Sequence, residues 1–444
     1  MTVTRRNLLS GCIGTLANFA LPIHTSAQRF VDASAFGVGE TADDQTAAFQ
    51  MAIDAAIGLQ QPLFLGPGTY SISNATIAGP LTIYGSGQTV LRLDTGETIL
   101  TIVDCDHVTL EGLTYEGMGP SSPESTLLDM VNVSNVVIRD CRFLHAAGTG
   151  IRAHNVQGRI ERCELSDIAN TGIFSTDSRG LDVEGNSITR CGNGGIRIWR
   201  SESGPDGSRI FGNRISEIDW TSGGNGQNGN GVNVFRADGV SISDNYITEC
   251  AFSAIRLNET HDTRVISNHC AKSGEVSIFS EFGFSGSIIS DNLVEGSAAG
   301  ISLTNFDRDG RLSICQGNII RNLTAGSVTN PDLIVPYGIA AEADAIITGN
   351  IVEAVPGTGI IVGWGPYLRN VLVSNNLVRN CDVGISVSVV PGVGLSRISG
   401  NVVSDYRQHA IVGVQWQEVV ATDLSAADYA NVSIGDNSIL APSR

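Results

Sequence analysis

Basic side chains are scarce in this sequence. Its 444 residues contain 27 Lys and Arg against 45 Asp and Glu, a formal net charge of −18 at pH 7. Nucleic acids and anionic membrane surfaces attract a basic footprint, so this composition argues against both as partners. Charged residues make up only 16% and hydrophobic residues 42%, which fits a chain with many alternate positions inside.

Long apolar runs and closely paired cysteines are also missing. The most apolar stretch near the start ends at Leu21 and is interrupted by Gly and Asn, so it is too short to span a bilayer. We therefore expect no stable membrane insertion. No Cys-x-x-Cys pair occurs, so we expect no metal site and no cofactor.

The first 27 residues read as an export signal. Arg5 and Arg6 precede an apolar run, and Thr25-Ser26-Ala27 offers small residues for cleavage. We interpret residues 1–27 as a twin-arginine signal peptide and predict a periplasmic or secreted protein that is exported folded. Cleavage removes two Arg and no acid, which leaves 25 basic and 45 acidic residues, a net charge of −20. Folding before export takes place in a reducing compartment, so we expect the remaining cysteines to be buried thiols.

A short motif recurs from about residue 138 to about residue 439. It reads VSISDNYI up to Ile247, AIITGNIV up to Val352 and VLVSNNLV up to Val378. One column of these copies is Asn, at intervals of 23 to 36 residues, and Cys141 and Cys163 occupy the same column in two earlier copies. The column consists of Asn186, Asn213, Asn245, Asn268, Asn292, Asn318, Asn350, Asn376, Asn401 and Asn437.

A period of this length predicts stacked repeats. Apolar residues alternate within each copy, which is the period of a strand, and three short strands per copy predict one coil of a β-helix. We expect the Asn to adopt φ > 0 at a tight turn and its side chain to bond to the Asn of the next coil. A set of unrelated β-hairpins is the competing explanation, but it does not account for one shared Asn column.

These repeats resemble those of the pectin-lyase-like superfamily of right-handed parallel β-helices. Residues 34–56 and 62–72 are similar to the N-terminal module of that superfamily, with a Phe-Gly start, an Asp-Asp helix entry and a Pro-Gly-Thr-Tyr strand. With its leader, the chain also resembles a family of twin-arginine-exported repeat proteins. The resemblance implies an all-β fold, a single-stranded right-handed parallel β-helix with an N-terminal capping helix. The fold hosts lyases, hydrolases, epimerases and adhesins, so it does not define the chemistry.

The expected organisation is a single continuous solenoid. It comprises a signal peptide at 1–27, a capping module at 28–80, the β-helix at 81–416, and a last coil with a C-terminal cap at 417–444. Within the capping module we predict a helix over residues 42–57, with Asp43 and Asp44 in its first turn. Phe49, Ile53 and Ile57 would form its apolar stripe and cover the open first coil.

A Gly-Ile strand follows each Asn, as in GIRI at Gly195 and GVNV at Gly231. Its Ile points inward, so the next residue and the one two further on point outward. In the central coils the first outward column is predicted to hold Arg197, Asn233, Arg256 and Ser277. The second is predicted to hold Trp199, Phe235, Asn258 and Phe279.

Two long loops, residues 216–230 and 322–337, lead into this strand. They enter four coils apart, about 19 Å at about 4.8 Å per coil, which leaves room for about four sugars. Aromatic rings beside polar groups suit sugar rings and their hydroxyls or carboxylates. The predicted substrate-binding residues are Arg197, Trp199, Asn233, Phe235, Arg256, Asn258 and Phe279. Alternatively, the arginines are spaced only to avoid like charges on adjacent coils and pair with surface acids.

Glu259 and Glu281 are the predicted catalytic residues, because a close carboxylate pair can act as acid and base or nucleophile. On so acidic a chain, however, two such glutamates are more often just surface residues. The catalytic motifs of polygalacturonases, alginate epimerases and pectate lyases do not occur in this sequence. We therefore predict an exported polysaccharide-binding β-helix, with lyase, epimerase or hydrolase activity on an acidic or neutral glycan as candidate activities. The alternatives are a non-catalytic envelope or surface protein and a structural repeat without a ligand.

Overall fold

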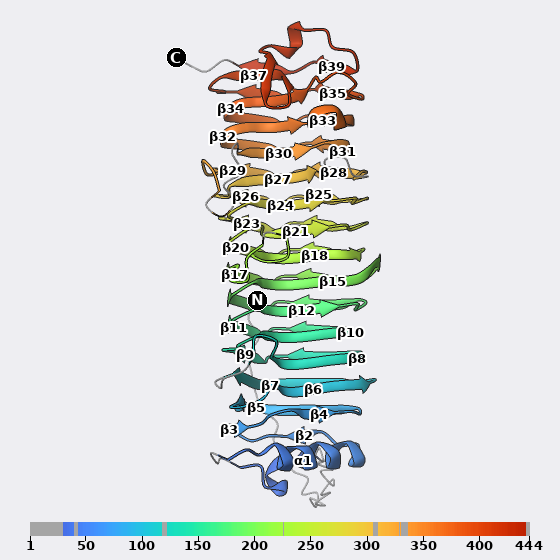
Figure 1. Cartoon of the computed structure of the whole chain (residues 1–444), viewed down its shortest axis with the longest axis vertical. Helices are drawn as coiled ribbons and strands as arrows, with labels where there is room; N and C mark the ends of the chain where they lie inside the picture. The colour runs from blue at the N-terminus through green and yellow to red at the C-terminus, as the bar shows by residue number, and fades with distance from the viewer. Residues whose placement is uncertain are drawn as a thin grey trace, which may run out of the picture.

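The computed structural model describes residues 30–39, 43–117, 122–224, 226–304, 310–327, 329 and 336–440. In this part of the chain the strands stack into a right-handed parallel β-helix of about 13 turns. Figure 1 shows a column with the helix α1 at one end and strands β37 and β39 at the other. The predicted fold class is confirmed, whereas the export signal predicted for residues 1–27 lies outside the described residues.

The elements follow in chain order. The first eleven strands are β1 (Val31–Asp32), β2 (Leu63–Phe64), β3 (Gly68–Ser71), β4 (Ala75–Ile77), β5 (Leu81–Leu93), β6 (Thr98–Cys105), β7 (Val108–Gly117), β8 (Thr126–Arg139), β9 (Arg142–Leu144), β10 (Thr149–Glu161) and β11 (Glu164–Ile168). The central coils contain β12 (Thr171–Thr176), β13 (Leu181–Glu184), β14 (Ser187–Cys191), β15 (Gly194–Pro205), β16 (Arg209–Phe211), β17 (Arg214–Ile218), β18 (Asn230–Asp238), β19 (Ser241–Ser243), β20 (Tyr246–Cys250), β21 (Ile255–Asn258), β22 (Arg264–Ile266), β23 (His269–Ala271), β24 (Val276–Glu281), β25 (Ile288–Ser290), β26 (Leu293–Glu295) and β27 (Ala299–Thr304). The last coils contain β28 (Ser313–Gln316), β29 (Ile319–Arg321), β30 (Tyr337–Ala341), β31 (Ala343–Thr348), β32 (Ile351–Val362), β33 (Arg369–Ser374), β34 (Leu377–Ser388), β35 (Ser396–Ser399), β36 (Val402–Ser404), β37 (His409–Gln415), β38 (Glu418–Ala421), β39 (Val432–Gly435) and β40 (Ser438–Leu440). The helices are α1 (Thr46–Leu59) and the 3-10 turns Ala33–Phe36, Gly365–Tyr367 and Leu424–Ala426.

Each central coil has three strands, as the repeat predicted. The coil made of β19, β20 and β21 pairs in parallel with β22, β23 and β24 of the next coil. Among the described strands, β37 and β38 form the one antiparallel pair. Inward side chains such as Ile242, Ile247 and Ile255 are at most 1% exposed and form one continuous core.

The Asn column forms the predicted ladder. Each Asn Nδ2 from Asn186 onward donates to Oδ1 of the Asn in the following coil, in nine consecutive links of 2.9–3.0 Å that end at Asn437. The predicted left-handed backbone is wrong for these Asn residues. The residue before each Asn has φ between 54° and 71°, for example Asp291 and Gly400. This preceding residue makes the turn, which leaves the Asn side chain directed inward along the column.

The helix α1 begins later than predicted, at Thr46 rather than residue 42. Asp44 therefore precedes the helix, where its Oδ1 accepts hydrogen bonds from the Thr46 N–H at 2.9 Å and the Thr46 hydroxyl at 2.6 Å. The predicted apolar stripe is confirmed, since Phe49 and Ile53 are fully buried and Ile57 is partly buried against the core. The helix packs on β4 and closes the first coils.

All eight cysteines of the described chain are buried and free. Burial raises the pKa of Cys191, Cys270 and Cys315 to about 12, so these thiols stay protonated and unreactive at neutral pH. The expectation of buried thiols is confirmed for these residues.

Candidate functional site

The predicted substrate-binding residues and Glu281 lie on the outward face of β15, β18, β21 and β24, which we call the strand face. Cross-coil pairing aligns Arg197, Asn233 and Arg256 in one column. It aligns Trp199, Phe235 and Asn258 in the second column. The sequence reasoning therefore brought these six residues together correctly.

The next coil is shifted by two residues from its predicted position. Arg256 pairs with Phe279, and Asn258 pairs with Glu281, so Phe279 belongs to the first column and Glu281 to the second. The predicted first-column residue Ser277 instead precedes this position. Ile278, rather than Val276, aligns with Ile255 of the previous coil. A two-residue shift preserves the alternation of faces, so the periodicity alone does not reveal it.

Arg197 is buried beneath this surface without an acidic partner among the described residues. Its side chain lies between the rings of Phe174 and Trp199, at 5.8 Å and 5.4 Å from their centroids. Its Nη2 donates to the Asn193 carbonyl at 3.0 Å and to Asn228 Oδ1 at 2.6 Å. Burial alone lowers the pKa of Arg197 to about 10, which leaves it charged at neutral pH.

Half-buried aromatic rings form a row over this arginine. Trp199 meets Phe174 edge-on at 5.1 Å and Phe235 at 5.9 Å. Its Nε1 donates to Asn233 Oδ1 at 2.6 Å, and Asn233 Nδ2 donates to the Gly226 carbonyl at 3.2 Å. These bonds fix the tryptophan and tie the loop before β18 to the strand face.

Arg256 is the centre of a buried charge cluster. Its Nε and Nη2 donate to the two carboxylate oxygens of Glu281 at 2.7 Å and 3.0 Å, and its Nη1 donates to Glu275 at 3.1 Å. The three side chains are 5–7% exposed. Phe279 covers the guanidinium at 4.9 Å, and Asn258 Nδ2 adds a hydrogen bond of 2.9 Å to Glu281. The arginine is therefore held by the protein's own carboxylates.

The two predicted catalytic glutamates have separate partners. Glu259 follows β21 at a corner with φ of 51°, and its carboxylate accepts from Arg236 Nε at 2.9 Å with 44% of the side chain exposed. Arg236 also lies over the Phe235 ring at 4.7 Å. Glu281 is instead enclosed with Arg256, so the two carboxylates occupy different environments on neighbouring coils.

Glu275, Glu342 and Tyr337 lie in or near this cluster and were not predicted as site residues. Glu275 and Glu342 are 4% and 2% exposed. Burial and the charges of Glu275, Glu342 and Glu281 raise the pKa of the Tyr337 hydroxyl, so it remains a neutral donor. Glu342 lies three residues after Ile339 of its Gly-Ile strand, at the second outward position, which was a sequence signal. Glu275 instead precedes β24.

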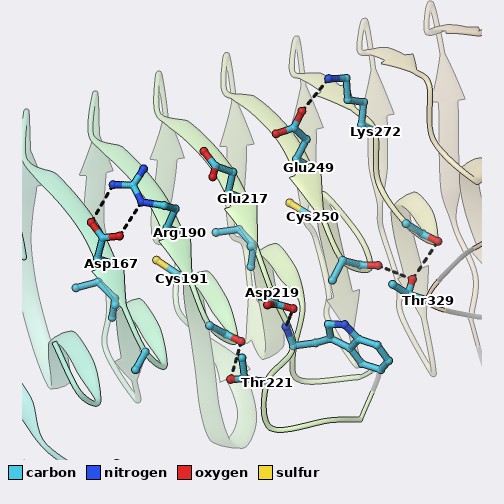
Figure 2. Close-up of a pocket in the computed structure, with 17 residues that line it drawn as sticks. Asp167, Arg190, Cys191, Glu217, Asp219, Thr221, Glu249, Cys250, Lys272 and Thr329 are labelled. Atoms are coloured by element: carbon cyan, nitrogen blue, oxygen red, sulfur yellow. Dashed lines mark hydrogen bonds and ion pairs between the residues drawn. The ribbon is translucent and has the colours of Figure 1, made fainter. Parts of the chain in front are cut away.

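A groove of about 1040 Å³ lies at the corner before the strand face, and we call it the corner groove (Figure 2). It follows the turns at the ends of β11, β14, β17, β20 and β23. Thr221 N–H donates to the Gly192 carbonyl at 2.8 Å, and the Thr329 hydroxyl donates to the Ala251 carbonyl at 2.5 Å. Parts of both predicted long loops thus form its walls. The groove is lined by Asp167, Ile168, Ala169, Arg190, Cys191, Gly192, Glu217, Ile218, Asp219, Trp220, Thr221, Glu249, Cys250, Ala251, Lys272, Gly274 and Thr329.

One row of charged residues borders the corner groove across five successive coils (Figure 2). Asp167, Arg190, Glu217, Glu249 and Lys272 all have φ between 53° and 58°, so each presents its side chain at the same bend. Arg190 donates to both oxygens of Asp167 at 2.7 Å and 2.8 Å, and Lys272 donates to Glu249 at 2.7 Å. The Arg190 hydrogen bonds lower the pKa of Asp167 to about 2.

Residues 68–215 match the family model described as a right handed beta helix region. The chain is a right-handed parallel β-helix protein. PfbA, a surface adhesin of Streptococcus pneumoniae, has a similar structure with a TM-score of 0.53 and 12% identity, covering 88% of this chain and 94% of that one. No curated protein matches the sequence.

Two other solved structures with a similar fold are an enzymatically active domain and a lyase complex. The enzymatically active domain of bacteriophage CBA120 tailspike protein 2 has a TM-score of 0.51 and 16% identity, covering 65% of this chain and 47% of that one. The β-helix protein thus spans about half of that tailspike chain. A PL6 alginate lyase in complex with a trisaccharide has a TM-score of 0.49 and 11% identity, covering 94% and 96%. At 12% and 16% identity, the similarity to the adhesin and to the tailspike domain shows the fold alone.

The β-helix protein offers aromatic, amide and carboxylate groups on two adjoining surfaces, a set suited to hydroxyl-rich ligands. Within the described ranges, no group of three or more His, Cys, Asp or Glu side chains is arranged to hold a metal ion. No helix in those ranges is long and apolar enough to cross a membrane.

Proposed function

We propose that this β-helix protein is exported and binds a polysaccharide along the strand face. The observation that carries the proposal is the row of half-buried rings of Phe174, Trp199, Phe235 and Phe279 on four of five successive coils. Ring faces stack on the apolar faces of sugars, and the neighbouring amides can bond to hydroxyl groups. Successive coils repeat at about 4.8 Å, so rings from the two outward columns on four of five coils offer several contacts along a linear chain.

The fold supports this proposal by analogy. The tailspike domain, the surface adhesin and the lyase complex named above share the β-helix architecture. The same architecture serves enzymes and adhesins, so it leaves the reaction open.

The hydrogen bonds of the Glu281 carboxylate favour binding without turnover over catalysis. Both of its oxygens accept hydrogen bonds from Arg256, and one accepts a third from Asn258. A carboxylate held in this way is committed to its partners before any substrate arrives. Lyase, epimerase and hydrolase activities on an acidic or neutral glycan remain the catalytic alternatives, with Glu281 and Glu259 as their candidate acid and base.

Affinity electrophoresis in gels that contain uronate-rich or neutral polysaccharides tests the binding proposal. We expect one polysaccharide to retard the protein, and Phe235→Ala to weaken that binding by about 0.5–1.5 kcal/mol. Phe211→Ala is the matched control, because Phe211 is also half-buried beneath an arginine, at 5.5 Å from Arg209, but lies on β16. Equal retardation of both variants would show that the strand face is not the binding surface.

Turnover is tested with the polysaccharide that binds. Incubation followed by measurement of new reducing ends and unsaturated products detects hydrolase and lyase activity, and proton exchange at the sugar carbons detects epimerisation. We expect no product. A product that disappears in Glu281→Gln or Glu259→Gln, while retardation persists, would establish the catalytic alternative.

Export through the twin-arginine route is part of the same proposal. Replacing both Arg5 and Arg6 by Lys should retain the precursor in the cytoplasm, because the arginine pair is the recognised feature of such leaders. Cell fractionation measures the outcome, and undiminished export of the double variant would contradict the route.

A further inference from the structure

The corner groove is a second surface with a ligand chemistry of its own. Its floor is apolar, formed by Ile168, Ala169, Ile218 and Ala251. Trp220 is 37% exposed, and its ring is held edge-on against buried Phe252 at 5.0 Å. A fixed, accessible indole beside an apolar floor provides a stacking platform for a ring with one apolar face.

The charges of the groove are not balanced among the described residues. Arg190 is paired with Asp167, and Lys272, the only lysine in the sequence, is paired with Glu249. Glu217 and Asp219 also line the groove and are exposed, but neither forms an ion pair in the described part of the chain.

The hydrogen bonds of these two carboxylates leave room for a ligand. Glu217 accepts a hydrogen bond from the Thr189 hydroxyl at 3.3 Å, and Asp219 Oδ1 accepts one from the Trp220 N–H at 2.8 Å. Each carboxylate has further acceptor sites. Because Asp219 immediately precedes Trp220, a cation bound there would lie next to the indole.

We propose that the corner groove binds an oligosaccharide that carries free amino groups. One sugar ring would stack on Trp220 with its ammonium group held by Asp219, and Glu217 would hold the ammonium group of a neighbouring ring. Charge-assisted hydrogen bonds to carboxylates are stronger than neutral ones, and an ammonium near an indole gains cation–π attraction. An N-acetylated sugar lacks the charge, and a uronate would be repelled by the same carboxylates.

The length of the corner groove and the negative electrostatic potential of the protein both suit a cationic oligosaccharide. From the coil of Asp167 to the coil of Lys272 there are four steps, about 19 Å, and Figure 2 shows the charged row running along this direction. The net charge of −18 attracts a cationic chain at long range. The inference is independent of the strand face, because none of the rings in its aromatic row lines the corner groove.

Isothermal titration calorimetry with a glucosamine hexamer, its fully N-acetylated form and a galacturonate hexamer tests the inference. We expect the glucosamine hexamer to bind at least about tenfold more tightly than either of the others. Its affinity should fall as salt rises, and it should also fall when the pH is raised until the amines lose their charge.

Four variants assign that binding to the groove. Trp220→Ala and Glu217→Gln should each weaken the glucosamine hexamer about tenfold. Trp416→Ala and Glu418→Gln are the matched controls, because both residues are exposed at the far C-terminal end, and Trp416 is also stacked edge-on against another Trp at 5.7 Å. The controls should bind as the unmodified protein does, with unchanged circular dichroism in all four variants.

Several results would overturn the inference. Equal binding of the acetylated and free hexamers would remove the role of the amines, and tighter binding of galacturonate would reverse the charge argument. Unchanged affinity in both Trp220→Ala and Glu217→Gln, or equal loss in the far-end controls, would place any binding elsewhere on the protein.

Discussion

Replacing Asn292 by Ala should destabilise the protein strongly, because the Asn ladder crosses its core. The Asn292 side chain is 1% exposed. Its Nδ2 donates to the Val265 carbonyl and to Asn318 Oδ1, each at 2.9 Å. Its Oδ1 accepts from the backbone N–H of Asn268 at 2.9 Å and from Asn268 Nδ2 at 3.0 Å.

Four side-chain hydrogen bonds are lost in this variant. At about 0.5–1.5 kcal/mol each, the free energy of unfolding should fall by about 2–6 kcal/mol. The upper part of that range is expected, because the backbone N–H of Asn268 is left buried without its ladder acceptor. A solenoid transmits such a loss to the neighbouring coils.

Asn437→Ala is the matched control at the end of the ladder. Its side chain makes three such bonds rather than four, of 2.9–3.0 Å, to Asn401 and Ile398. It is only half-buried, so water can replace them. We expect about 1 kcal/mol or less for this variant. Guanidinium unfolding followed by circular dichroism measures both, with the m-value as a check on two-state behaviour. Losses that agree within about 0.5 kcal/mol would refute the ladder as a buried stabilising element.

Three further predictions concern acid, thiols and packing. Arg190 lowers the folded-state pKa of Asp167 to about 2, so the stabilisation from Asp167 is full above its unfolded pKa and is lost as pH falls through about 2. Thermal melts should thus separate Asp167→Asn from the unmodified protein at pH 7 and converge at low pH; a constant difference would contradict the pairing. A thiol reagent should label none of the eight buried cysteines in the native protein and all of them after denaturation, and fast native labelling would disprove their burial. In Gly300→Ala the new Cβ would lie 2.1 Å from the Gly338 carbonyl oxygen, which should cost about 1–3 kcal/mol, whereas Gly58→Ala in α1, with open space around it, should be neutral or stabilising; equal denaturation midpoints would contradict the clash.

The fold was predictable because one inward position repeats. Asn at this repeated position predicts side chains that stack from coil to coil, and the structure contains the predicted hydrogen bonds between them. The backbone prediction failed because Asn suits both a left-handed turn and an inward ladder, and composition cannot tell which applies. The turn belongs to the preceding position, which accepts Gly, Asp, Ser or Asn, as at Asp291 and Gly400.

The strand face was predictable in outline and not in detail. Alternation identifies which side of a strand faces outward, and this grouped Arg197 with Trp199 and Arg256 with Asn258. The two-residue shift of Phe279 depends on which hydrophobic residue aligns with Ile255 of the previous coil. Packing between coils decides this alignment, and the pattern within one strand does not show it.

The sequence also did not predict that outward-facing residues of the strand face are buried. The sequence shows an Arg at position 256, but it does not show whether this side chain is free to bind a ligand or is paired with Glu275 and Glu281, as it is in the structure. The corner groove escaped prediction although its charged row lies at one position of the repeat, four residues after the Asn or Cys column. Its walls come from the two long loops, which share no repeat and whose course the sequence does not define.

The Asn ladder also gives the molecule a net dipole along the axis of the β-helix. Every link runs the same way, from the Nδ2 of one Asn to the Oδ1 of the Asn that follows it in sequence. Strand-to-strand bonds of a parallel sheet point both ways and largely cancel, whereas these aligned amide dipoles add. The positive end therefore lies at Asn437, beside the exposed carboxylate of Asp436, and each coil added to such a chain would lengthen the dipole.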